Sequence, residues 1–214
     1  MSFHLSVFKY LFQVNFKIFY PQKLTQYLII LNLMLKPFKT VAESRMTFSE
    51  LMLPSHTNFS GKIHGGFILS LMDQIAFSCA SRHSGSYCVT ASVDTVDFLR
   101  PIEIGELVTL KACVNFVGKT SMVVGIRVEA ENIRTGEVNH CNSSYFTMVA
   151  KDENGVSIPV PGLILKSDDA VRRFLESIKR KEQKRQNQKE FAETVFSPED
   201  YLDQLEGYNV RVEV

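Results

Sequence analysis

The stretch from Phe67 to Ser81 constrains the fold of this 214-residue chain more than any other feature, because almost every position in it is apolar. Two glycines, Gly65 and Gly66, precede the stretch, and polar side chains interrupt it at few positions. These positions are Ser70, Asp73, Gln74 and Ser78. A helix that is apolar on all sides has to be surrounded by the rest of its domain. The sequence therefore predicts a buried helix that begins near Gly65.

Two segments after this helix, Leu107–Phe116 and Met122–Ala130, show the period-two alternation of half-buried antiparallel strands, and the alternation blurs in Glu137–Ala150. In Leu107–Phe116, for example, apolar side chains occupy the even positions, and Phe116 is the last of them. Five strands are expected, at Arg45–Leu53, Tyr87–Phe98, Leu107–Phe116, Met122–Ala130 and Glu137–Ala150. One buried helix with a meander of long strands predicts an α+β fold, in which an antiparallel sheet wraps around the helix. Such a sheet covers its helix on one face only, and the open face and edge predict an oligomer.

The composition of the chain changes toward both ends. Residues 1–42 contain five lysines and no acidic residue, whereas acidic side chains outnumber basic ones in the last part of the chain. The predicted parts are an N-terminal extension at 1–42, a domain at 43–165, a charged helix at 166–192 that Ser167 caps, and an acidic tail at 193–214. The extension has two interpretations: a start assigned upstream of the true initiator, Met34 or Met46, or a helix that lies on a membrane surface.

Composition also argues against several classes of protein. The formal net charge of +1 lacks the basic excess that nucleic-acid-binding domains carry. A membrane-spanning helix is not expected, because it would need a run of about 18 or more apolar residues. The four cysteines, at positions 79, 88, 113 and 141, are widely separated and have no histidines at ligand spacing. We therefore expect reduced, mostly buried thiols, no metal site and a cytoplasmic location.

The polar loop before the helix is the first candidate for chemistry. It runs from His56 to His64 and leads into Gly65 and Gly66. The first N–H groups of a helix have no partner within the helix, and they carry the positive end of its dipole. Glycines there allow a ligand carbonyl to approach the backbone, as an oxyanion site for an acyl group requires. Close packing of the helix on the sheet explains the two glycines equally well.

Asp73 is the second candidate, because it lies about two turns into a helix that is predicted to be buried. A buried carboxylate without a partner tends to hold its proton and suits the role of a general base. The alternative is a carboxylate that a strand backbone or Arg82 satisfies. The residues alone leave both interpretations open.

A series of short motifs adds a resemblance to a known family. In chain order the motifs are Thr57-Asn58-Phe59-Ser60-Gly61, His64-Gly65-Gly66, Leu71-Met72-Asp73, Val89-Thr90-Ala91-Ser92-Val93-Asp94, Asp97-Phe98-Leu99, Ile104-Gly105-Glu106, Lys119-Thr120-Ser121-Met122 and Glu131-Asn132-Ile133. Together they resemble the hotdog-fold acyl-CoA thioesterases, in the branch of the cytosolic, brain-type acyl-CoA hydrolases. The resemblance covers about residues 44–180. Each motif is weak alone, but their number and order make the match specific.

The resemblance implies a thioester hydrolase that converts acyl-CoA to free fatty acid and CoA without a metal, a cofactor or a covalent serine. In relatives with two repeats, the catalytic asparagine and aspartate come from different repeats, whereas one repeat carries both Asn58 and Asp73 here. A double-hotdog dimer would then build two equivalent sites, each with Asn58 from one chain and Asp73 from the other. The backbone of Gly65 and Gly66 would polarise the thioester. A trimer of such dimers is the expected assembly.

The resemblance also suggests residues that contact CoA, although surface charge is an alternative for each. They are His64, Arg82, Lys119 and Ser121. Two other functions on the same fold stay open. A non-catalytic acyl-CoA-binding protein would keep the pocket but lose Asp73. An enoyl-CoA hydratase or dehydratase would need a histidine as its base, and His64 lies in a place better suited to structure.

Overall fold

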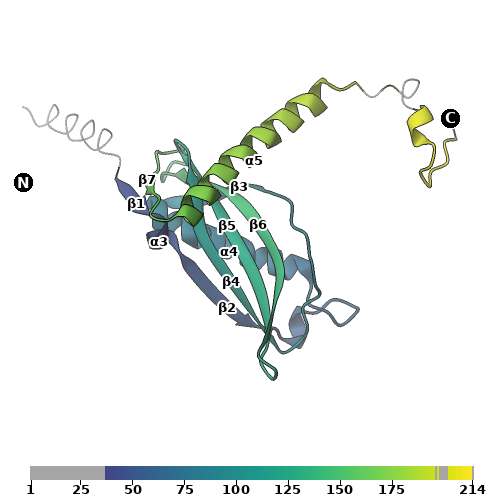
Figure 1. The fold of residues 1–214 in the computed structure, drawn as a ribbon, viewed down its shortest axis with the longest axis horizontal. Helices are drawn as coiled ribbons and strands as arrows, with labels where there is room; N and C mark the ends of the chain where they lie inside the picture. Colours follow the sequence, from purple (N-terminus) through teal and green to yellow (C-terminus); the bar gives the residue numbers. More distant parts are fainter. Residues whose placement is uncertain (1–36, 196, 198–201, 214) are drawn as a thin grey trace, which may run out of the picture. The chain divides into compact units, whose positions relative to one another are not determined.

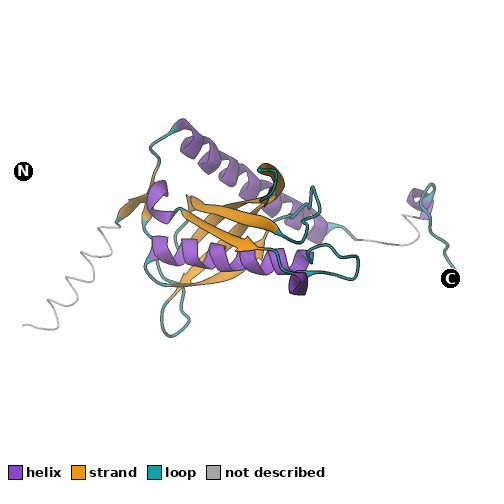
Figure 2. Ribbon diagram, turned by 90° about the horizontal axis from the view of Figure 1, so that it is seen from below, coloured by secondary structure: helices purple, strands orange, loops and turns teal. Residues whose placement is uncertain are grey.

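The computed structural model describes residues 37–195, 197 and 202–213, and the chain divides after Lys166 into two units. In the first unit, an antiparallel sheet of five strands curls along helix α4, which spans Gly65–Ser84 (Figures 1 and 2). The helix begins where the sequence predicts, and it ends at Gly85 in the left-handed conformation (φ 73°) that favours glycine. The predicted α+β fold, with a sheet wrapped around a long helix, is confirmed.

The strands follow the order β2-β4-β5-β6-β3 across the sheet, so β2 and β3 form its edges. Their bounds are Met46–Leu51 (β2), Tyr87–Val93 (β3), Glu106–Val117 (β4), Ser121–Asn132 (β5) and Glu137–Lys151 (β6). Short turns join β4 to β5 and β5 to β6, so these three strands pair as consecutive hairpins. Four of the five predicted strands are confirmed to within a few residues.

The strand that was predicted to reach Phe98 ends at Val93, so the second half of that prediction is wrong. Its pairing with β6 already shifts register inside the strand. Beyond the strand, residues 94–100 follow β6 through only two backbone hydrogen bonds, which the N–H groups of Asp94 and Leu99 donate (3.0 and 2.9 Å). Alternation continues along this segment, but a regular ladder does not.

A bulge in β4 changes which side chains face the helix near the end of that strand. The register between β4 and β5 shifts between Val114 and Phe116. The extra residue reverses the alternation, so Val117 packs against the core and Phe116 does not belong to it. The prediction that Phe116 points into the core is therefore wrong.

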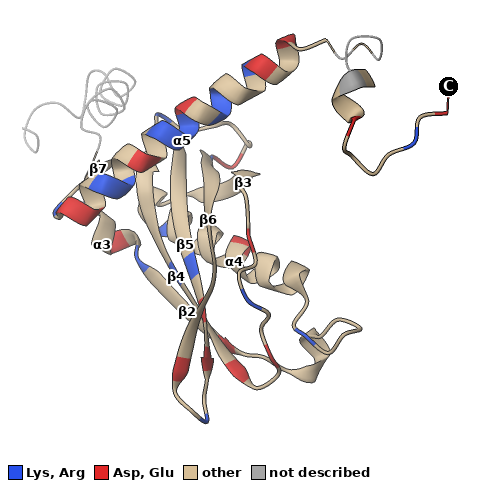
Figure 3. Ribbon diagram, turned by 45° about the vertical axis from the view of Figure 1, so that its right-hand side comes forward, with Lys and Arg blue, Asp and Glu red and all other residues tan. Residues whose placement is uncertain are grey.

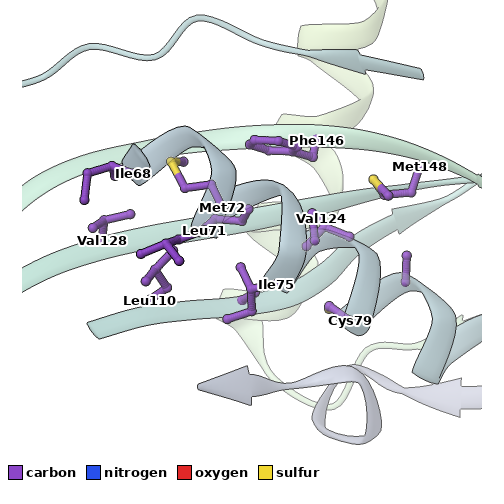
Figure 4. Close-up of a cluster of buried hydrophobic side chains, with 14 of the residues drawn as sticks. Ile68, Leu71, Met72, Ile75, Cys79, Leu110, Val124, Val128, Phe146 and Met148 are labelled. Atoms are coloured by element: carbon purple, nitrogen blue, oxygen red, sulfur yellow. The ribbon is translucent and has the colours of Figure 1, made fainter. Parts of the chain in front are cut away.

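The hydrophobic core lies between α4 and the sheet (Figure 4). Helix α4 contributes Ile68, Leu71, Met72, Ile75 and Cys79 to it. The strands contribute Leu110, Val124, Val128, Phe146 and Met148. The opposite stripe of α4 is exposed and contains Ser70, Asp73, Gln74 and Phe77. In the single chain the sheet covers only one face of the helix, as the expected sheet arrangement predicts, and the exposed stripe departs from the all-round burial that the apolar run alone predicts.

All four cysteines are free and buried, as the sequence predicts. The Cys79 thiol, for example, donates a hydrogen bond to the carbonyl of Ser44 (3.1 Å). Burial raises the pKa of Cys79 to about 12. This thiol is therefore protonated and unreactive at neutral pH.

The residues just before position 43 belong to the folded unit, although the sequence assigns them to an extension. The elements here are β1 (Phe38–Thr40), α3 (Val41–Ser44) and β7 (Gly162–Ile164), and β1 pairs in parallel with β7. The Lys39 ammonium donates to two carbonyls of the last turn of α4 (2.7 and 3.2 Å). The buried Ser44 hydroxyl accepts from an N–H of β4 (3.0 Å). The folded unit thus begins before residue 43, and the rest of the predicted extension, residues 1–36, lies outside the described residues.

In the second unit, helix α5 spans Asp168–Glu193 and confirms the predicted charged helix. The Ser167 hydroxyl accepts a hydrogen bond from the Ala170 N–H (3.2 Å), as an N-cap does. Basic and acidic side chains follow one another along α5 (Figure 3), and pairs one turn apart, such as Arg172 and Glu176, stabilise it. A short 3₁₀ helix, η2, spans Leu202–Leu205. Across the described part of the chain, none of the helices has the length and apolarity that crossing a membrane requires.

Candidate active site

The loop that leads into α4 begins with a short 3₁₀ helix, η1 (Pro54–His56), and Asn58 holds its tip in a closed turn. The Asn58 Oδ1 accepts hydrogen bonds from the N–H groups of Ser60 (2.9 Å) and Lys62 (3.2 Å). Asparagine side chains often close turns in this way. The side-chain nitrogen of Asn58 has no partner among the described residues, so it can donate to a ligand.

His64 caps the N-terminus of α4. Its Nδ1 accepts a hydrogen bond from the Gly66 N–H (2.9 Å). A Cβ at Gly66 would lie 3.0 Å from this Nδ1, and a Cβ at Gly65 would lie 3.1 Å from the ring of Phe98. A side chain at either position would therefore have to displace the neighbouring ring by a few tenths of an ångström. The Gly65 N–H has no hydrogen-bond partner within residues 37–195, so it is the donor at this helix end that a ligand carbonyl can reach.

Asp73 lies two turns further along α4, on the exposed stripe. Its Oδ1 accepts a hydrogen bond from the hydroxyl of Thr90 on β3 (2.5 Å). A charge-assisted hydrogen bond of this kind fixes the orientation of the carboxylate. Arg82, the partner that the sequence offers as an alternative, donates instead to the carbonyl of Arg45 (3.1 Å). The burial predicted for Asp73 is wrong for the single chain, because the sheet leaves this stripe open.

A groove of about 520 Å³ lies beside Asp73 and Thr90. The residues that line it are Asp73, Gln74, Phe77, Ser78, Tyr87, Cys88, Val89 and Thr90. The rings of Phe77 and Tyr87 meet edge to face in its wall, with their centroids 5.5 Å apart. The groove therefore combines an apolar wall with a carboxylate along the edge strand β3, a combination that suits an apolar ligand with one reacting polar group.

The structure does not bring Asn58 and Asp73 together within one chain. Asn58 precedes the helix and does not line the groove. Asp73 lies eight residues beyond Gly65, which corresponds to about 12 Å along the helix axis. Asp73 therefore lies well along the helix from the N-terminus into which the Asn58 loop leads.

The four residues expected to contact CoA lie on different elements. Arg82 is in the last turn of α4, whereas Lys119 and Ser121 belong to the turn between β4 and β5. His64 is engaged as the helix cap. None of the four lines the groove beside Asp73.

Thr90 is the residue of this region to which the sequence assigns no role. It belongs to one of the family motifs, but a threonine in an alternating strand is typical of any strand face. Its hydrogen bond to Asp73 joins residues that lie 17 positions apart. The two residues come into contact because β3 packs beside the exposed stripe of α4, and this packing cannot be inferred from the local sequence.

Fold and site together define a class of protein. A sheet curled around one helix is the hotdog fold, and the open side of this helix carries a fixed carboxylate and an N-terminus with an uncommitted N–H. An N–H donor can polarise a carbonyl, and a carboxylate can activate the water that attacks it. In the part of the chain that the structure describes, no group of three His, Cys, Asp or Glu side chains is placed to hold a metal ion.

Comparisons with known proteins identify the family. A family profile described as Thioesterase superfamily matches residues 60–137. Protein VdlD of Helicobacter pylori is 43% identical over 143 residues, which are 67% of this chain and 82% of that protein. The uncharacterized acyl-CoA thioester hydrolase YkhA of Bacillus subtilis is 37% identical over 129 residues, 60% of this chain and 75% of that protein. The chain belongs to the hotdog-fold acyl-CoA thioesterases.

Solved structures agree with this membership. A hexameric acyl-CoA thioesterase in its apo form has a TM-score of 0.69 and 37% identity, covering 71% of this chain and 97% of that one. The acyl-CoA hydrolase from Staphylococcus aureus, in complex with butyryl coenzyme A and coenzyme A, has a TM-score of 0.67 and 30% identity, covering 78% of this chain and all of that one.

The Staphylococcus aureus enzyme has also been solved as three alanine variants, of an asparagine, an aspartate and a threonine. In that chain the asparagine lies 15 positions before the aspartate, and the threonine lies 17 positions after it. The same spacings separate Asn58, Asp73 and Thr90 in this chain.

Proposed function

We propose that this chain hydrolyses acyl-CoA to free fatty acid and CoA at a site built around Asp73. Family membership supports the reaction class, and the hydrogen bond between Thr90 and Asp73 at the open groove is the observation that carries the assignment. The carboxylate accepts a proton from water as the water oxygen attacks the thioester carbonyl. The C–S bond then breaks, and the proton passes to the departing CoA thiolate.

The other groups act on the thioester. The Gly65 N–H donates to the carbonyl oxygen, where negative charge develops in the transition state. The free amide nitrogen of Asn58 donates to the thioester or to the attacking water. Because Asp73 lies about 12 Å along the helix axis from Gly65, Asn58 and the Gly65 N–H come from one chain and the Asp73 that acts on the same thioester comes from a second copy. In this proposal the Gly66 N–H does not contribute to the oxyanion site, because it already donates to His64.

The second copy belongs, in this proposal, to a double-hotdog dimer. Strand β3 forms an edge of the sheet, and Phe77, Tyr87 and Val93 are exposed beside it. Pairing of two copies along β3 would extend both sheets and cover these apolar side chains. One solved relative is hexameric, which supports a trimer of dimers as the complete assembly.

Three smaller assignments complete the proposal. The phosphates of CoA contact Arg82, Lys119 and Ser121, which lie outside the groove beside Asp73. The reaction uses no metal or cofactor. The protein acts in the cytoplasm, which the free buried cysteines and the cytosolic acyl coenzyme A thioester hydrolase among its relatives (human, 33% identical, 64% of this chain and 37% of that protein) support.

A hydratase or dehydratase on the same fold is less compatible with the site. That chemistry needs a histidine as its base, and the described residues that line the groove include none. A non-catalytic binder would not need the carboxylate that Thr90 holds in place. CoA release from an acyl-CoA, without change to the double bond of an enoyl-CoA, would separate the three functions.

The decisive variant is Asp73→Asn, which is nearly isosteric and keeps a hydrogen-bond acceptor for Thr90. It should fold normally and lower kcat by about 10²–10⁴, the usual contribution of a general base. The measurement is CoA release, followed with a thiol-trapping reagent. Asp152→Asn is the matched control, since it removes the same charge from a turn and should leave kcat unchanged. Hydrolysis by folded Asp73→Asn within about threefold of wild type would overturn the assignment.

A further inference from the structure

The hydrogen bonds at the start of α4 account for all but one of its first N–H groups. The N–H groups of Phe67 and Ile68 donate to the carbonyl of His64 (3.0 and 3.4 Å). The Gly66 N–H donates to Nδ1 of the His64 ring (2.9 Å). Only the Gly65 N–H has no partner among the described residues. Within the described part of the chain, the Gly65 N–H is therefore the one donor at this helix end that a ligand can use, because the next three N–H groups all donate to His64.

The first turn of this helix is built from two glycines, which do not hold a backbone conformation by themselves. Something else has to fix the direction of the Gly65 N–H. Two rings do so by contact: Phe98 lies against Gly65 and the His64 imidazole lies against Gly66, so close that a Cβ at either glycine would meet the ring at 3.1 and 3.0 Å. The backbone of His64 is itself anchored, because its N–H donates to the carbonyl of His56 (2.8 Å).

We propose that His64 is a positioning residue for thioester hydrolysis: by capping Gly66 through Nδ1, its ring fixes the direction in which the Gly65 N–H points. The proposal rests on the proposed function of Gly65 as the donor to the thioester carbonyl. Because Nδ1 is the acceptor, the proton of the neutral ring is on Nε2. His64 acts through the helix backbone and contacts neither the substrate nor the reacting atoms.

This role differs from two others that the same side chain could have. A histidine that binds CoA would contribute to substrate affinity, so its loss would raise KM. A histidine that only stabilises the helix would contribute to folding, so its loss would lower Tm without changing the kcat of the folded enzyme. A positioning residue acts on the transition state, where the carbonyl oxygen becomes negative, so its loss lowers kcat at unchanged KM.

The test compares His64→Ala with His64→Asn in the full chain, at a temperature where both variants are fully folded. Asparagine is a good N-cap acceptor, whereas alanine cannot accept a hydrogen bond. We expect His64→Ala to lower kcat for an acyl-CoA by about tenfold or more at unchanged KM, since small displacements of a catalytic donor have effects of this size. His64→Asn should restore most of the kcat. An unchanged kcat in folded His64→Ala, or a rise in KM alone, would overturn the proposal.

A double-mutant cycle with Gly66→Ala adds an independent readout. Alanine favours the helix, so its cost at this position arises from displacement of the His64 ring. Gly66→Ala should therefore lower kcat in the wild-type background but cause no further loss in the His64→Ala background. Equal losses in both backgrounds would show that the His64 ring does not transmit the effect. Wild-type activity and the Asp73→Asn variant, measured in parallel, distinguish failure of this proposal from failure of the proposed function.

Discussion

The two faces of helix α4 differ in their burial and in the chemistry of their side chains. The face toward the sheet is wholly buried, with Met72 and Ile75 in its centre, and it holds the domain together. The opposite face is open in the single chain, and it carries Asp73 and the partly exposed ring of Phe77. Of two neighbouring residues, Met72 therefore packs in the core and Asp73 lines the groove. The residues that form the core and those that line the groove thus lie on separate stripes of one helix.

The largest expected effect lies on the buried face. Met72→Ala should lower the free energy of unfolding by about 2–5 kcal/mol, because it removes a fully buried side chain and leaves a cavity in the core. Gln74→Ala, two residues away on the exposed face, should change it by less than about 0.5 kcal/mol. Urea denaturation of both variants measures the difference. If both variants lost similar free energy of unfolding, the exposed stripe would contribute to stability as much as the buried one, which would contradict the comparison.

A smaller effect is expected at the exposed face, where Thr90 contacts Asp73. Thr90→Val removes the hydroxyl that orients Asp73 but keeps the shape of the side chain. Because Asp73 would then lose its fixed direction, kcat should fall by about tenfold while stability stays nearly unchanged. Thr90→Ser keeps a hydroxyl and should retain most of the activity. Steady-state kinetics on the three proteins would contradict this role if Thr90→Val matched wild type.

The sequence predicts those parts of the fold that depend on local pattern. Alternation places β4 and β5 correctly, and the apolar run after Gly65 marks the start of α4. The misplaced features depend on packing between distant segments. A single extra residue in β4 turns Phe116 away from the core, and the strand that begins at Tyr87 loses its ladder after Val93. The local sequence pattern predicts neither the bulge in β4 nor the early end of the β3 ladder.

The same division holds for the candidate site. Asp73 and the two glycines stand out in the sequence because polar or small residues are unusual around a buried helix. Asn58 lies in a polar loop and is singled out only through the resemblance to the family. Thr90 does not stand out, because threonine is common in strands and its partner lies on another element. The engagement of the Gly66 N–H by His64 is equally invisible, since it depends on the rotamer of one ring.

The central claim is that each active site combines Asn58 of one chain with Asp73 of another, and mixing two inactive variants tests it most directly. Asn58→Ala and Asp73→Asn should each be nearly inactive alone. After co-refolding in equal amounts, activity should return to about a quarter of wild type, because about half of the C2 dimers are mixed and each mixed dimer contains one intact site of two. CoA release by the mixture, compared with the sum of the separate variants, is the measurement. Mixed dimers that form but show no activity above that sum would contradict the shared site.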